Sequence, residues 1–263
     1  MGTTRTHYAS AYGRTIAIES SEIDLVLPFL PFPWVSEAPS VEIDRRYQVS
    51  TLGEERFVLA IDGAEPSERA GLGQIGDEIE GDLHHWLATY TRGYLFVHSG
   101  CVSWRHWAIV IPGRSHAGKT TLTRALVEAG ATYYSDDYAV VAPDGLIWPF
   151  PRRLWVRPIT ADPPHRLDPV SANWQIGTAP IRAAIVAEVK FDREAGWKVE
   201  RLTHGMGSLS LLDNTVAARE RPEDSLRMMA NVMDSAIAIK GTRDDAESSA
   251  RRLLALVDEV LGG

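Results

Sequence analysis

Residues 113–120 read G-R-S-H-A-G-K-T, in which two glycines frame a loop that ends in a lysine and a hydroxyl. This spacing is the Walker A pattern, whose glycines let backbone N–H groups face phosphate oxygens. A lysine at this position lies near the β- and γ-phosphates, and the following hydroxyl can bind Mg²⁺. The pattern predicts a nucleotide-phosphate site made of Gly113, Arg114, Ser115, His116, Ala117, Gly118, Lys119, Thr120 and Thr121.

The flanking residues fit such a site. Residues 107–111 (W-A-I-V-I) form a short apolar run typical of a buried parallel strand. Beyond Lys119, apolar residues recur at helical spacing as far as Gly130, which suits a helix end. This strand–loop–helix order favours the phosphate site over the alternative, an ordinary glycine connection.

An acidic pair, Asp136-Asp137, follows Lys119 by 17 residues, at the end of an apolar and aromatic segment. Beside a γ-phosphate, one carboxylate could hold Mg²⁺ while the other orients or deprotonates an attacking hydroxyl. Two adjacent carboxylates repel each other, which raises the pKa of one of them. The alternative is a solvated pair in a β-turn.

Several further segments must position these residues. We expect a strand over residues 94–102, which carries His98, and strands over 132–135 and 138–142 on either side of the Asp pair. A hairpin returns at residues 146–148, and a second strand pair covers 181–191 and 197–202. Residues 149–180, rich in Pro and Arg, predict a long loop of the kind that is often functional. Helices are expected to open at Pro222 and at a capping box formed by Thr242 and Asp245.

The N-terminal quarter carries no catalytic signal. Residues 6–62 look β-rich, and the turn-forming residues 62–75 mark a domain boundary. A helix is expected from Asp77 to about Thr91, with His84 and His85 on its surface. We therefore expect a β-rich region over residues 1–75, which is either a small accessory sheet or a surface that recognises a substrate or partner.

The composition disfavours several classes of protein. The 263 residues are 44% hydrophobic and 24% charged, with a net charge of −8, which disfavours nucleic-acid binding. Cys101 is the only cysteine, so no disulfide framework or multi-cysteine metal site is expected, and Cys101 itself is predicted to be a buried structural residue. The chain shows no signal peptide and no membrane-spanning run, and a cytoplasmic location is expected.

The segment from His98 to Asp137 (H-S-G-C-V, I-P-G-R-S-H-A-G-K-T-T, Y-Y-S-D-D) resembles the HPr kinase/phosphorylase family. These bacterial enzymes transfer phosphate from ATP or pyrophosphate to a protein serine, and their P-loop fold is similar to that of ATP-dependent phosphoenolpyruvate carboxykinase. The resemblance covers residues 94–148. It implies an α/β fold, with a P-loop kinase-like domain over residues 76–263.

The resemblance also implies residue roles. Lys119 and Thr120 match the phosphate and Mg²⁺ positions, and Asp137 matches the catalytic base. Asp136, as a metal ligand, and His98 would be the polar partners of that base. Without the resemblance, His98 reads equally well as a buried structural histidine.

Three departures indicate a diverged member rather than the phosphocarrier enzyme. His116 stands where the family has a glycine, the family's Glu- and Gly-rich signature is missing after the Asp pair, and the N-terminal quarter differs. We expect an ATP- and Mg²⁺-dependent kinase that phosphorylates a hydroxyl, on a peptide or protein serine or on a small molecule. The residues do not decide between ATP, GTP and pyrophosphate, or between a monomer and a homo-oligomer.

Two alternative functions remain. One is a catalytically weak nucleotide-binding module that regulates or recognises a partner. The other is a carboxykinase-like lyase, which the sequence disfavours because the chain has only four lysines: Lys119, Lys190, Lys198 and Lys240.

Overall fold

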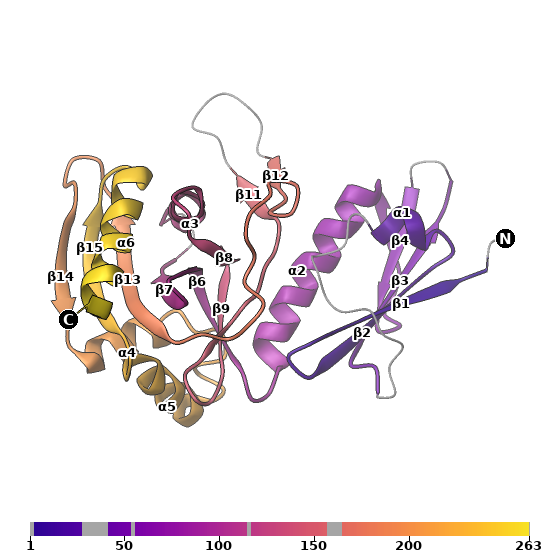
Figure 1. Cartoon of the computed structure of the whole chain (residues 1–263). Coiled ribbons are helices and arrows are strands. Elements are labelled where there is room, and N and C mark those ends of the chain that lie inside the picture. The colour runs from indigo at the N-terminus through magenta and orange to yellow at the C-terminus, as the bar shows by residue number, and fades with distance from the viewer. Residues whose placement is uncertain (1–2, 28–41, 54–55, 115–116, 157–164, 263) are drawn as a thin grey trace. The chain divides into compact units, whose positions relative to one another are not determined.

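The computed structural model describes residues 3–27, 42–53, 56–114, 117–156 and 165–262. These residues form a mixed α/β structure with six helices and several sheets. The chain divides into two compact units, Met1–Thr91 and Arg92–Gly263 (Figure 1). The division therefore falls after Thr91 rather than at the expected boundary near residue 75. The cause is the helix α2 (Leu72–Tyr90), which packs on elements of the N-terminal unit.

The N-terminal unit is a five-stranded sheet with the order β1-β2-β3-β4-β5. Strands β2 and β3 are parallel, and the other neighbours are antiparallel. Its elements are β1 (Arg5–Ala11), β2 (Arg14–Ser20), α1 (Ile23–Val26), β3 (Arg45–Thr51), β4 (Arg56–Ile61), β5 (Ser67–Ala70) and α2. The β-rich character expected for this region is present.

Helix α2 buries a broad face. Ile79, Leu83 and Leu87 are at most 1% exposed, as their helical spacing predicts. The helix begins at Leu72 rather than at the expected Asp77, which adds the buried Ile75 to this face. The expected surface position of His84 is wrong: the side chain is 5% exposed. It lies one turn from buried residues on either side, so that the buried stripe is wider than the apolar spacing indicates.

The C-terminal unit is built on an eight-stranded sheet with the order β10-β9-β6-β7-β13-β15-β14, and β8 pairs with β6. Strands β7, β13 and β15 are parallel, whereas β6 is antiparallel to β7. The carboxyl ends of the three parallel strands therefore meet at one edge of the sheet. The bounds are β6 (Leu95–Trp104), β7 (Trp107–Pro112), α3 (Lys119–Glu128), β8 (Thr132–Ser135), β9 (Tyr138–Val141), β10 (Ile147–Trp148), β11 (Leu154–Val156), β12 (His165–Leu167), β13 (Ala183–Phe191), β14 (Lys198–Leu202), α4 (His204–Leu212), α5 (Pro222–Met233), β15 (Ile237–Arg243) and α6 (Ala246–Gly262).

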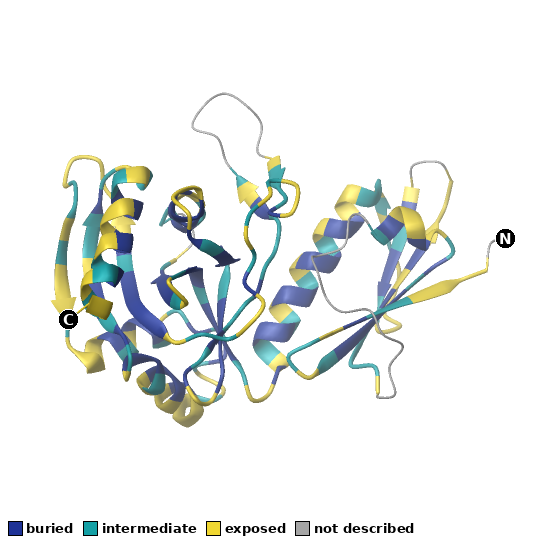
Figure 2. Ribbon diagram, viewed as in Figure 1, coloured by how far each residue is buried: buried dark blue, intermediate teal, exposed yellow. Residues whose placement is uncertain are grey.

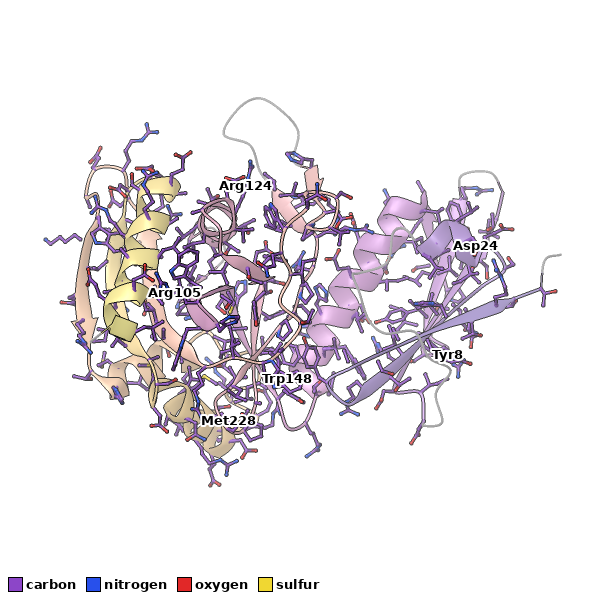
Figure 3. All side chains as sticks on the ribbon, in the orientation of Figure 1. Tyr8, Asp24, Arg105, Arg124, Trp148 and Met228 are labelled. Carbon is purple, nitrogen blue, oxygen red and sulfur yellow. The ribbon has the colours of Figure 1, made fainter. Side chains whose placement is uncertain are left out.

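The central strands of this sheet, such as β7 and β13, are buried on both faces, whereas the edge strand β14 is largely exposed (Figure 2). On β7, Ile109 and Ile111 face a core layer completed by α3 and α6, whereas Ala108 and Val110 face the layer completed by α4 and α5. Met228 of α5 packs into the second layer (Figure 3). A strand covered on both faces reads as a continuous apolar run, which is the pattern of residues 107–111.

The segment 149–180 and the start of α6 differ from what the sequence predicts. The segment 149–180 contains a short hairpin of β11 and β12, with residues 157–164 outside the described part. Thr242 belongs to β15 and not to a capping box; Asp245 alone caps α6, accepting a hydrogen bond from the Ser248 N–H at 2.8 Å. None of the helices in the described ranges is long and apolar enough to cross a membrane.

Candidate functional site

The glycine loop, residues 113–118, connects β7 to α3 at the sheet edge where the parallel strands end. The Gly113 N–H donates to the His98 carbonyl oxygen at 3.3 Å, which ties the loop to β6. Gly118 has a φ of 82°, a left-handed conformation that favours glycine, and it directly precedes α3. The N-cap residue Gly118 has no side chain with which to cap this helix start, so the first N–H groups and the positive dipole end of α3 lie at the loop. Ser115 and His116 lie outside the described residues.

The Lys119 side chain is hydrogen-bonded to the start of the glycine loop. The side chain is buried, and Nζ donates to the carbonyl oxygens of Gly113 at 2.7 Å and Arg114 at 3.1 Å. These contacts use two of its three donors. Burial lowers the pKa of Lys119, and the charges of Asp137 and Asp136 oppose that shift. The ammonium group thus lies between the loop and the acidic pair. The side chains of Arg114 and Thr121 are exposed, whereas Ala117 is partly buried.

The Asp pair occupies a break between β8 and β9, which both run antiparallel to β6. The Ser135 Oγ atom accepts hydrogen bonds from the N–H groups of Asp137 at 3.2 Å and Tyr138 at 3.0 Å, which folds the backbone locally. The Ser99 N–H donates to the Asp137 carbonyl oxygen at 2.9 Å. These hydrogen bonds hold the pair against β6, so it is not a solvated turn.

Asp136 is a buried carboxylate, 6% exposed. Thr120 Oγ1 donates to its Oδ2 atom at 2.9 Å, and the Tyr133 hydroxyl donates to Oδ1 at 3.3 Å. Burial raises the pKa of Asp136, helped by Asp137 and opposed by Arg152 and the two hydroxyl donors. The hydroxyl of the glycine-loop motif and the first carboxylate of the Asp pair are thus in direct contact.

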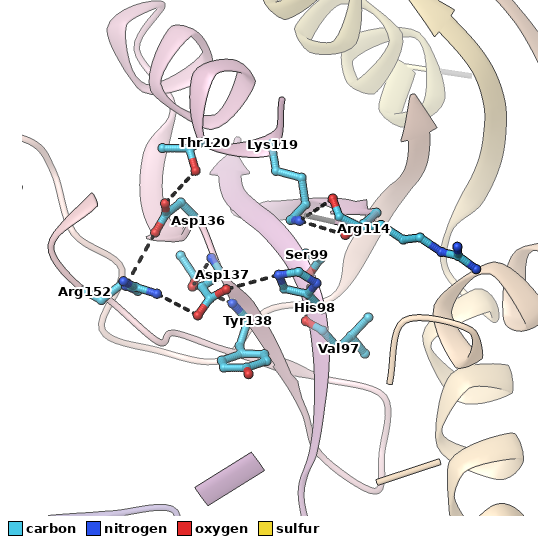
Figure 4. A network of polar contacts seen from close by, with 12 residues as sticks. Val97, His98, Ser99, Arg114, Lys119, Thr120, Asp136, Asp137, Tyr138 and Arg152 are labelled. Carbon is cyan, nitrogen blue, oxygen red and sulfur yellow. Dashed lines mark hydrogen bonds and ion pairs between the residues drawn. The ribbon is translucent and has the colours of Figure 1, made fainter. Parts of the chain in front are cut away.

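Asp137 lies between two basic groups (Figure 4). Its Oδ2 accepts from Arg152 Nη1 at 2.7 Å, and its Oδ1 is 3.3 Å from His98 Nε2. Arg152 Nε also lies 3.9 Å from Asp136 Oδ1. His98 is partly exposed, with 30% of its side chain accessible, and it is not a wholly buried structural histidine. Arg152 thus contacts both carboxylates from the segment that follows β10.

The structure brings Thr120, Asp136, Asp137 and His98 into one network through Arg152. Lys119 hydrogen-bonds to the glycine loop instead, close enough for the charges of both aspartates to act on it. Three residues near the site were missed from the sequence. Tyr133 and Arg152 contact the Asp pair, and Arg243 contacts the Gly118 carbonyl oxygen. Arg152 belongs to the Pro- and Arg-rich segment that the sequence marks as functional, but nothing singles it out among the arginines there. Tyr133 lies in the Y-Y-S-D-D run, but its spacing assigns it no role, and Arg243 lies in no motif.

Arg243, at the end of β15, is 2% exposed. Its Nη2 donates to the Gly118 carbonyl oxygen at 3.0 Å, and Nη1 donates to the Asp244 carbonyl oxygen at the same distance. A Cβ on Gly118 would lie 2.4 Å from Nη2. The positive φ of Gly118 favours glycine, and an added Cβ would also displace the Arg243 guanidinium group.

The residues present suit a magnesium–phosphate group. Within the described ranges, no three His, Cys, Asp or Glu side chains form a cluster that could hold a metal ion. Magnesium does not need one, because it takes one or two carboxylates and fills its other positions with phosphate oxygens and water. Thr120 and Asp136 would hold the ion, and Lys119 with the N–H groups at the start of α3 would hold the phosphates.

No protein-family model matches the chain, and a search of curated proteins finds no match. The contacts around Lys119 and the Asp pair are therefore the basis on which a function can be proposed.

Proposed function

We propose that the Arg92–Gly263 unit is a P-loop domain that binds a magnesium–nucleoside triphosphate and transfers its γ-phosphoryl group to a hydroxyl. The observation that supports this is the 2.9 Å contact between Thr120 and Asp136, with Asp137 next to it. In P-loop enzymes a hydroxyl and an acidic side chain together hold Mg²⁺ beside the γ-phosphate. Asp136 is well suited to the ion, because a cation would compensate a carboxylate that burial disfavours.

The proposed reaction assigns a role to each member of the network. Asp137 accepts the proton of the acceptor hydroxyl as its oxygen bonds to the γ-phosphorus. The bond from that phosphorus to the bridging β–γ oxygen breaks, and the electron pair leaves with the nucleoside diphosphate. Lys119 and the loop N–H groups stabilise the charge on the leaving phosphate. Bound Mg²⁺ would neutralise phosphate charge during transfer.

Arg152 and His98 would support Asp137. Arg152 holds one carboxylate oxygen at 2.7 Å, and His98 faces the other at 3.3 Å, so that the carboxylate is oriented from two sides. The Arg152 guanidinium group can also contact negative charge as it collects on the transferring group, because it presents several donors in a fixed plane. The acceptor class proposed is an alcohol: a serine of a peptide or protein, or a small molecule.

The test combines binding with transfer. Calorimetry with Mg·ATP should show binding by the wild type and by Asp137→Asn, and severe loss in Lys119→Ala, which removes a charge-assisted phosphate contact. Single-turnover transfer from γ-labelled ATP to serine peptides, products of neighbouring genes and small alcohols should then be about 10²–10⁴-fold slower in Asp137→Asn.

Asp234→Asn is the matched control, since this exposed aspartate lies at the end of α5. It should bind and transfer like the wild type. Transfer at the wild-type rate by Asp137→Asn would refute the base assignment. Binding without transfer to any acceptor would favour the alternative, a nucleotide-binding regulatory module.

A further inference from the structure

The two sides of the glycine loop differ in chemistry. On one side of β7 lie β6, β8 and β9, which carry His98 and the Asp pair. On the other side lie β13 and β15, whose carboxyl ends reach the same sheet edge. On the proposed function, the γ-phosphate of a bound nucleotide lies on the first side. The nucleoside must then extend away from the Asp pair, toward the ends of β13 and β15.

The end of β13 presents an aromatic ring beside the loop. Phe191 is the last residue of β13, and it is 46% exposed. Its Cβ lies 3.8 Å from the position that a Cβ on Gly118 would occupy. A half-exposed phenylalanine next to a phosphate-binding loop offers an apolar face to whatever the loop holds.

Arg243 fixes this ring in place. Its Cζ lies 5.3 Å from the centroid of the Phe191 ring, within the range of a cation–π contact, while its Nη2 holds the Gly118 carbonyl oxygen. Because the guanidinium group lies over one face of the ring, the exposed area is left to the other face and the edge. Arg243 Nε is buried and has no hydrogen-bond partner in the described part of the chain.

We propose that Phe191 is the surface on which the nucleobase stacks when the glycine loop holds the nucleotide phosphates. Every nucleobase has a π-face, and base–aromatic stacking adds affinity without hydrogen-bond readout. This inference rests on the proposed function. The structural alternative is that Phe191 only shields Arg243 from water.

The experiment compares two ligands that share the phosphate chain and differ in the base. Affinities for ATP and for inorganic tripolyphosphate, both with Mg²⁺, are measured by calorimetry on the full chain. Phe191→Ala should weaken ATP binding about tenfold or more, the size of one lost base stack. Tripolyphosphate affinity should stay within twofold of the wild type.

Three further variants sharpen the result. Phe191→Leu keeps an apolar cover over Arg243 and should show the same ATP-selective loss, even if Phe191→Ala folds poorly. Phe191→Tyr should retain ATP affinity. Trp155→Ala is the matched control, because this tryptophan is 40% exposed and also lies under an arginine, with Arg166 Cζ 5.5 Å from its ring; it should change neither affinity.

The outcomes are distinct. An equal loss for both ligands in Phe191→Leu would show that the ring only supports the loop, and it would overturn the stacking surface. Unchanged ATP affinity in Phe191→Leu would overturn it as well. In both cases the proposed function would stand. A wild type that binds neither ligand would instead refute the proposed function, and the stacking surface with it.

Discussion

At the scale of single residues, Asp136 shows how a buried charge opposes stability. Its carboxylate is buried, and the charge of Arg152 with the hydroxyls of Thr120 and Tyr133 only partly offsets the loss of water. Burial raises its pKa above the ordinary value of 3.8. The folded protein therefore retains a proton on Asp136 at pH values where the unfolded chain has lost it. The free energy of unfolding falls as pH rises through that interval, and above the raised pKa the full penalty is present.

Asp136→Asn should therefore raise the thermal midpoint at pH 8, because the amide carries no charge to desolvate. A gain of ~1 kcal/mol corresponds to about 2–4 °C in a unit of this size. The gain should shrink as pH falls through the raised pKa, and the variant should lose Mg²⁺-dependent ATP affinity. Calorimetric scans between pH 4 and 8, with Asp234→Asn as the control, measure the gain in thermal midpoint and its pH dependence. Titration calorimetry with ATP and Mg²⁺ measures the loss of affinity. Parallel pH profiles of the wild type and Asp136→Asn would contradict the argument.

At the scale of elements, the position of α3 depends on a glycine in β6. A Cβ on Gly100 would lie 2.3 Å from Thr123 Oγ1, and Thr123 is fully buried in α3. The two elements therefore approach too closely for any side chain at residue 100. Since α3 carries Lys119 and Thr120 at its start, this contact helps to set where these two side chains lie.

Gly100→Ala should reduce the free energy of unfolding by about 1–3 kcal/mol, the usual cost of overpacking. Thr123→Ala removes the clashing oxygen and leaves a Cβ 3.7 Å away, so the double variant should recover much of the loss. A denaturant-unfolding cycle measures this coupling. Gly205→Ala is the control, because nothing lies within 4 Å of the added Cβ. Additive effects of Gly100→Ala and Thr123→Ala would disprove the contact.

At the scale of the whole molecule, the core of the Arg92–Gly263 unit encloses the single thiol. Cys101 is fully buried in β6, in the layer that α4 and α5 complete, as the sequence predicts. Burial raises the pKa of the thiol far above its ordinary range. Thiolate is the reactive form, so chemical modification requires this unit to open.

An aromatic disulfide reagent should therefore label Cys101 only at the rate at which this unit opens. Mg·ATP should slow labelling, because a ligand that binds the native state stabilises it. Absorbance of the released thiolate follows the reaction, and Lys119→Ala should show no protection by nucleotide. Rapid, complete labelling under native conditions would contradict the burial of Cys101.

The sequence by itself determined the features that depend on neighbouring residues. The apolar run at residues 107–111 and the helical spacing after Lys119 predicted β7 and α3, because side-chain periodicity is a local property. The glycines, Lys119 and Thr120 could be identified as candidate site residues because they belong to one short motif. The Asp pair was expected near them, because it ends an apolar and aromatic segment after the helix that follows the loop.

Only the tertiary structure decided which distant side chains complete the site. Arg152 reaches Asp137 from beyond β10, and Arg243 reaches Gly118 from the end of β15. The boundary after Thr91 and the burial of His84 likewise depend on what α2 packs against. The physical reason is the same in each case: strand pairing and helix packing bring these residues together, and neither is encoded by the residues next to them in the chain.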